Sequence, residues 1–218
     1  MSHTNVRFAS LISLYLLSLA IGCTDSGGGG APPGGEGELA INPPKIFTGF
    51  DGTNTYKAPV VSTPASGAEW SIGDPSLADI APDGDGTQLM ITTKKAGTTT
   101  ITVKAGGQTA TAELIIAAYT TEQHDVGERR YMEGGGGDPG CITCHANGPD
   151  HTPTQVDADT DEQVINSFVN GVDPEGVPIP TPKHMWSVTE EEKPGLVSYL
   201  RSLEPAGYPE PDQPTPGN

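Results

Sequence analysis

The chain has 218 residues, a formal net charge of −17, 29 Gly, 21 Pro and three Cys. A hydrophobic fraction of 34% is low for one continuous core of this length, so part of the chain is expected to be linker and tail. The negative charge argues against binding to nucleic acid or to an anionic membrane surface, and it favours basic protein partners.

The first residues have the features of an export signal. Residues 1–22 contain no acid, and an apolar run follows Arg7 and ends directly before Cys23. That run is shorter than the roughly 20 residues that a membrane-spanning helix needs. Residues 19–23 (Leu-Ala-Ile-Gly-Cys) resemble a bacterial lipoprotein signal, which implies cleavage before Cys23 and a diacylglycerol on its sulfur. An ordinary signal peptide and an uncleaved anchor stay open as alternatives.

Two segments have the composition of linkers. Residues 23–37 are rich in Gly and Pro and predict a flexible tether behind the lipid-bearing Cys23. Residues 205–218 contain five Pro and predict a disordered tail. The expected location is therefore outside the cytoplasm, with a lipid anchor in the periplasm or at the outer membrane or cell surface.

Residues 38–118 predict a small all-β sandwich. Short apolar-rich segments alternate with turn signals at a spacing of about ten residues. The clearest alternation is in residues 98–105, where Ile101 and Val103 share one face and Thr100 and Thr102 share the other. The predicted strands cover residues 39–41, 56–61, 68–72, 77–80, 89–91, 98–105 and 109–118.

Residues 68–71, 74–78, 95–103 and 112–116 resemble the bacterial Ig-like group-2 (BIG2) domains. The resemblance implies two packed sheets with Trp70 as the central aromatic residue between them. It also implies a spacer or an adhesive module rather than a catalytic domain.

Cys141-Ile142-Thr143-Cys144-His145 matches the C-x-x-C-H pattern of c-type haem attachment. Two thiols at this spacing can reach the two vinyl groups of one haem, and the following imidazole can bind the iron. A redox dithiol usually lies on a thioredoxin-like βαβ pattern, and a zinc site needs two further ligands at suitable spacing. The sequence therefore predicts that Cys141, Cys144 and His145 hold one covalent haem c.

The segment around this motif, residues 119–204, resembles a small monohaem cytochrome c. A first helix over residues 122–132 carries Gly127 and Tyr131, which in that family let it cross the last helix closely. Capping boxes at residues 160–163 and 189–192 begin two further helices. The predicted fold class is thus a multi-domain chain, an all-β Ig-like sandwich followed by an all-α cytochrome c domain.

The second axial ligand is predicted from the loop before the last helix. In the cytochrome family a Met in this loop usually binds the iron, and Met185 lies there, preceded by His184. Met185 is the favoured ligand and His184 is the alternative. His124 is expected on the exposed face of the first helix. The acidic run at residues 157–162 is interpreted as a solvated face and a helix cap rather than a metal site.

These features predict one-electron transfer by a membrane-tethered cytochrome, with redox partners that carry basic docking surfaces. Two alternatives stay open. One is a haem-based small-ligand sensor or peroxide-reactive protein, and the other is surface adhesion through the Ig-like domain. No residue is assigned a catalytic role.

Overall fold

The computed structural model describes residues 37–63, 67–145, 151–179 and 184–210. The predicted signal, the lipid attachment at Cys23 and nearly all of the tether lie outside these described residues. Within the described ranges, no helix combines the length and the apolar character needed to cross a bilayer.

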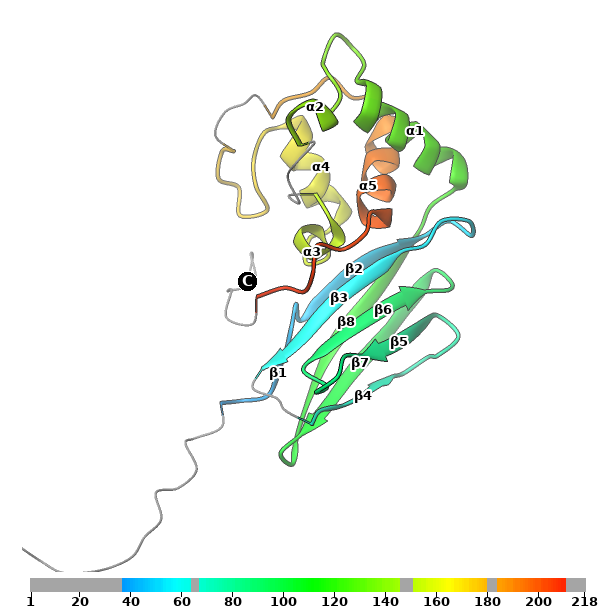
Figure 1. The fold of residues 1–218 in the computed structure, drawn as a ribbon. Helices are drawn as coiled ribbons and strands as arrows, with labels where there is room; N and C mark the ends of the chain where they lie inside the picture. Colours follow the sequence, from blue (N-terminus) through cyan, green and yellow to red (C-terminus); the bar gives the residue numbers. More distant parts are fainter. Residues whose placement is uncertain (1–36, 64–66, 146–150, 180–183, 211–218) are drawn as a thin grey trace, which may run out of the picture. The chain divides into compact units, whose positions relative to one another are not determined.

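The described strands form two four-stranded sheets (Figure 1). The first sheet has the order β1-β3-β6-β5 and the second has the order β2-β8-β7-β4. All pairs are antiparallel except β2 and β8. The strands are β1 (Ala40–Asn42), β2 (Lys45–Phe50), β3 (Lys57–Thr63), β4 (Glu69–Ile72), β5 (Ala78–Pro82), β6 (Gln88–Thr93), β7 (Gly97–Ala105) and β8 (Gln108–Ala118).

The predicted sandwich is confirmed, and its core is made by the alternating apolar positions of both sheets. Ile101 and Val103 of β7 are fully buried, as the alternation predicts. Trp70 differs from the prediction, because β4 is an edge strand and its indole is only half-buried there. Its Nε1–H donates to the Gly86 carbonyl at 2.6 Å. The centre between the sheets is aliphatic: Ile46, Val60, Leu89, Ile91, Ile101, Val103 and Leu114.

Strand β2 was not predicted from the sequence. It pairs in parallel with β8, from Lys45 beside Glu113 to Phe50 beside Ala118. The strand is short and lies between a Pro-Pro step and an Asp-Gly turn, so its pattern of alternation is brief. In the structure Ile46 and Thr48 are both buried, which is the period of two expected of a strand, but a threonine does not mark a buried position in the sequence.

The helices of the remaining segment are α1 (Thr121–Glu133), α2 (Ile142–His145), α3 (Pro153–Val156), α4 (Asp161–Val169) and α5 (Glu192–Ser202). The predicted capping box of Thr160 and Gln163 begins α4. The side chains and amides of Thr189 and Glu192 also bond reciprocally ahead of α5. Helix α1 is capped by Thr120 and begins one residue before the predicted helix over residues 122–132.

Helices α1 and α5 lie side by side (Figure 1), and their closest approach is at two glycines. A Cβ added to Gly195 would lie 2.6 Å from the Gln123 carbonyl oxygen, and one added to Gly127 would overlap the Gly195 carbonyl. Only residues without a side chain allow this backbone contact. The expectation that Gly127 lets the first helix cross the last one closely is confirmed.

The helical segment does not form a separate all-α domain, which corrects the predicted fold class. It belongs with the sandwich to one compact unit. Arg201 of α5 donates through Nη1 to the Phe47 carbonyl of β2 at 2.7 Å. Tyr56 of the sandwich and Ser198 of α5 share a buried hydrogen bond of 2.7 Å. The physical reason is that α5 has polar partners on β2 that the sequence pattern did not reveal.

Residues 205–210, predicted to belong to a disordered tail, lie against other parts of the chain. The Ala206 amide donates to the Thr152 hydroxyl at 3.3 Å, and the Thr154 hydroxyl donates to the Gly207 carbonyl at 3.1 Å. The Asn42 amide side chain donates to the Glu210 carbonyl at 3.0 Å. Residues 211–218 lie outside the described residues.

Candidate functional site

The predicted attachment motif lies on a single turn of helix. The amides of Cys144 and His145 both donate to the Cys141 carbonyl, at 3.1 and 3.0 Å. Cys141 lies directly before α2 and Cys144 lies within it, so the two thiols are about one helical turn apart. The Cys141 side chain is half-buried, whereas Cys144 is exposed, and neither thiol is in a disulfide bond.

A cavity of about 360 Å³ opens beside α2. That volume lies in the range of sites that bind small molecules and cofactors. Its walls combine aliphatic and aromatic side chains with three imidazoles and one thiol. The lining includes Tyr131, Cys141, His145, His151, Val156, Asp159, Val164, Phe168, Ile179, His184, Trp186, Leu196 and Leu200.

Three imidazoles gather at this cavity, two of them from nearby positions, His145 and His151, and the third from His184. The ring centroids of His145 and His151 lie 3.9 Å apart with the planes tilted by 34°. The ring of His184 lies 6.0 Å from that of His145 in an edge-to-face arrangement, and Trp186 lies 5.3 Å from His184. The fold therefore brings together two nitrogen donors, His145 and His184, that are 39 positions apart in the sequence.

The two candidates for the second axial ligand differ in where the fold places them. His184 is half-buried and lines the cavity. Met185 is 58% exposed, is absent from the cavity lining and lies against Gly171 instead. The prediction that Met185 binds the iron would need its thioether at the cavity wall, and the side chain does not line the cavity.

The acidic run is not a solvated face, which corrects its interpretation. Asp157 and Asp159 are only 2% and 6% exposed. The buried guanidinium of Arg201 lies among them and donates to the Val156 and Asp159 carbonyls and to the Asp161 carboxylate. Asp161 is the first residue of α4, directly after the Thr160 cap, and is partly exposed, so only the first part of the run was misread.

Burial changes the acidity of groups at this cavity. It raises the pKa of Asp159 to about 6, although Arg201 opposes the shift. It also raises the pKa of Asp157 well above its ordinary value. The pKa of the Cys141 thiol is raised by burial too, while the nearby Arg130 guanidinium lowers it. At neutral pH the Cys141 sulfur is thus held as a thiol in apolar surroundings.

Sequence reasoning did not identify the role of Arg201. A signal was present, because Arg201 follows Val197 by one helical turn and so falls on the apolar face of α5. A basic side chain on that face, in a chain with an unassigned acidic run, indicates a buried ion pair. The other correction is His124, which was expected to be exposed and is 7% exposed.

Comparison with known protein families finds similarity within the sandwich. The family model of the N-terminal region of pilus formation proteins matches residues 55–116. Solved structures with similar parts include domains 4 and 5 of the S-layer protein SbsC, at 15% identity and a TM-score of 0.31, over 38% of this chain and 53% of that one. The M1 domain from titin matches at 8% identity and a TM-score of 0.31, over 38% of this chain and 95% of that domain.

An endo-fucoidan hydrolase of glycoside hydrolase family 107 matches over 42% of this chain and 15% of its own, at 15% identity and a TM-score of 0.32. The chain spans about half the length of the SbsC fragment that it matches. No curated protein matches the chain.

Proposed function

We propose that this chain is a tethered c-type cytochrome that carries one covalent haem and transfers single electrons. The observation that carries the proposal is the position of the C-x-x-C-H motif, whose Cys141 and His145 line a mostly apolar cavity that a second imidazole, from His184, also reaches. The matched family concerns only the sandwich, so the proposal depends on this motif and cavity.

The donor set of the cavity fits a c-type haem. Thiols at positions 141 and 144 can add across two vinyl groups, so that each forms a carbon–sulfur bond and its proton passes to the neighbouring vinyl carbon. His145, at the end of α2, would supply a nitrogen ligand to the iron. Val164, Leu196 and other apolar side chains line the site. The haem, when bound, supplies an iron that alternates between ferrous and ferric states.

In this proposal His184 would be the second protein ligand to the iron. Its imidazole lines the cavity with its ring centroid 6.0 Å from that of His145, whereas the Met185 side chain is mostly exposed. Two imidazoles hold the ferric state better than an imidazole and a thioether do, so the redox potential is expected to be lower than with Met185.

Covalent attachment is tested by haem staining of the denatured full-length protein, produced with a c-type haem attachment system. The native chain is expected to stain. Cys141→Ser combined with Cys144→Ser is expected to abolish the stain, while Thr143→Ser, on the same turn, is expected to keep it. Staining of the double variant at the level of the native chain would contradict covalent haem attachment through these two cysteines.

The axial ligand is tested by absorption spectra of both redox states in His184→Ala and Met185→Ala. We expect the spectrum and the potential to change in the first variant and to stay those of the native protein in the second. A sulfur-to-iron charge-transfer band that disappears in Met185→Ala would assign Met185 instead. A five-coordinate native haem would favour the small-ligand sensor or peroxide-reactive alternative.

A second function, surface adhesion through the sandwich, is favoured by the comparison with pilus formation proteins, which supports it better than electron transfer. The same match supports a protein that is exported or associated with the cell envelope. Sedimentation of the full chain with insoluble cell-wall material tests this function, and binding that survives Cys141→Ser with Cys144→Ser would assign it to a part other than the haem site.

Lipid anchoring at Cys23 completes the proposal. The supporting observation is the lipoprotein-like sequence of residues 19–23 followed by the Gly- and Pro-rich tether. Radiolabelled fatty acid is expected to enter the native chain and not Cys23→Ser. Equal labelling of both would contradict the anchor.

A further inference from the structure

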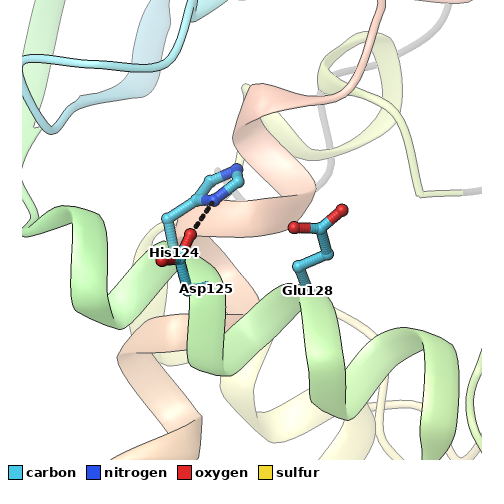
Figure 2. Close-up of side chains that lie close together, drawn as sticks. All are labelled: His124, Asp125 and Glu128. Carbon is cyan, nitrogen blue, oxygen red and sulfur yellow. Dashed lines mark ion pairs between the residues drawn. The ribbon is translucent and has the colours of Figure 1, made fainter.

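A cluster of three candidate ligands lies on α1, outside the cavity lining. His124, Asp125 and Glu128 each offer one ligand atom, and these atoms all lie within 4.8 Å of one another. Figure 2 shows the His124 ring turned towards Asp125, with Glu128 one helical turn further on. The two carboxylates are exposed, whereas the His124 side chain is 9% exposed. The cluster thus combines one buried imidazole nitrogen with two exposed carboxylates whose side chains can change conformation.

The hydrogen bonds around His124 assign its tautomer. The Ser202 hydroxyl lies 2.7 Å from the Tyr199 carbonyl, which can only accept, so the single hydroxyl proton is donated there. The same hydroxyl lies 2.9 Å from Nε2 of His124. It must therefore accept from that nitrogen, and Nε2 carries the proton. Nδ1 is left with a lone pair.

That lone pair faces groups that are also acceptors. Nδ1 is buried and has no hydrogen-bond partner among the described residues. The nearest charged atom is Oδ1 of Asp125 at 3.6 Å, beyond hydrogen-bond distance. Among the described residues no donor satisfies this buried acceptor, and a cation bound beside the two carboxylates would satisfy all three groups.

We propose that Nδ1 of His124 and the carboxylates of Asp125 and Glu128 bind a divalent transition-metal ion of the zinc class. Imidazole nitrogen with carboxylate oxygen suits this class. Tetrahedral ligands at zinc-type bond lengths lie about 3.4 Å apart, so the exposed carboxylates need to move inward only slightly. Three protein ligands leave one coordination position open to water or to a partner's side chain.

Ser202 has a defined part in this site. By accepting from Nε2 it fixes both the tautomer and the ring orientation that present Nδ1 to the ion. Tyr199 packs edge-to-face on the same ring, with centroids 5.6 Å apart. The nitrogen ligand is therefore held in place before the ion arrives, and only the carboxylates have to be ordered.

The test is calorimetric titration of Zn²⁺ into the full chain that carries Cys23→Ser, Cys141→Ser and Cys144→Ser, which removes all three thiols as competing ligands. One ion per chain is expected. Asp125→Asn with Glu128→Gln is expected to weaken binding by at least about tenfold, and Ser202→Ala by about 10- to 100-fold. Glu122→Gln, an exposed acid on the same helix, is the matched control and is expected to bind as the parent does.

Each outcome decides the proposal. The two carboxylate substitutions lie on exposed positions, so the variant keeps the helix packing that His124 substitution would disturb. Equal zinc affinity in this variant and the parent would overturn the site. Absence of zinc binding by the parent would also overturn it, and would leave a proton on Nδ1, paired with Asp125, as the cation.

Discussion

The interiors of the sandwich and of the helical segment are built from different kinds of side chain. The sandwich fills the space between its sheets with aliphatic side chains, and its strands satisfy one another's backbone groups. The helical segment has a smaller apolar cluster built around a cavity of about 360 Å³. It also buries charged groups, namely Arg130, Asp157, Asp159 and Arg201.

This difference teaches where each region's specificity comes from. Aliphatic packing tolerates substitutions that keep volume and pattern. Buried charges and close backbone contacts do not, because each depends on one partner in one place. The stability of the helical segment should therefore be more sensitive to single substitutions than its size suggests. A group that fills its cavity should stabilise it.

The largest expected effect follows loss of the buried guanidinium. Arg201→Met should destabilise the protein by about 3–5 kcal/mol, because the carbonyls of Phe47, Val156 and Asp159 lose their buried guanidinium donor. Urea unfolding measures this loss. Hydrogen exchange should also speed up at the Phe47 amide, which donates to the Asp157 carbonyl at 2.7 Å.

Arg129→Met is the matched control, since Arg129 is exposed on α1 and should change the free energy of unfolding by under about 0.5 kcal/mol. If Arg201→Met were as stable as this control, the buried arginine would not join the two regions, and the contrast between them would fail.

The next effect comes from the contact between α1 and α5. Gly127→Ala should cost about 3 kcal/mol, because the added methyl overlaps the Gly195 carbonyl and forces the two helices apart. Gly84→Ala is the control, since a Cβ there meets nothing within 4 Å. The midpoint of urea unfolding checks both variants. An unchanged unfolding midpoint in Gly127→Ala would mean that α1 and α5 do not pack as closely as described.

Much of the fold could be predicted from local pattern. The alternation in β7, the caps of Thr160 and Thr189 and the glycine on α1 are all short-range signals, and each corresponds to an observed element. Strand β2 was missed because its pairing with β8 joins residues almost 70 positions apart, and six residues carry too little alternation to indicate it.

The candidate site divides in the same way. The spacing of Cys141, Cys144 and His145 is local, so the attachment motif was readable from the sequence. The burial of Asp159 depends on Arg201, 42 positions later, and an acidic run with no visible partner indicates a solvated face. The choice between His184 and Met185 depends on which side chain the loop turns inward, and adjacent residues give no signal for that.

A smaller effect should appear as a pH dependence. Burial raises the pKa of Asp159 to about 6, above the usual 3.8. Between these values the folded state keeps a proton that the unfolded state releases, so this group's stabilisation is present below about pH 4 and is lost as the pH rises through about 6. Asp159→Asn should remove about 2 kcal/mol of that dependence.

Urea unfolding at several pH values from 4 to 7 measures the effect as the difference between native protein and variant, in which the other carboxyl groups cancel. Asp83→Asn, at an exposed turn, is the control and should leave the profile unchanged. A variant profile parallel to that of the native protein would show that Asp159 titrates with its ordinary pKa.

The smallest effect sharpens the comparison at the hydrogen bond that joins the two regions. Tyr56→Phe should cost about 1–2 kcal/mol, because it leaves the buried Ser198 hydroxyl without the partner at 2.7 Å. Tyr56→Phe with Ser198→Ala should cost less than the two single losses together, since no buried polar group then remains unpaired. Urea unfolding of the native protein, the two single variants and the double variant gives the interaction energy by a double-mutant cycle. Strictly additive losses would mean that the two hydroxyls do not interact, and that Arg201 alone supplies the polar link between α5 and the sandwich.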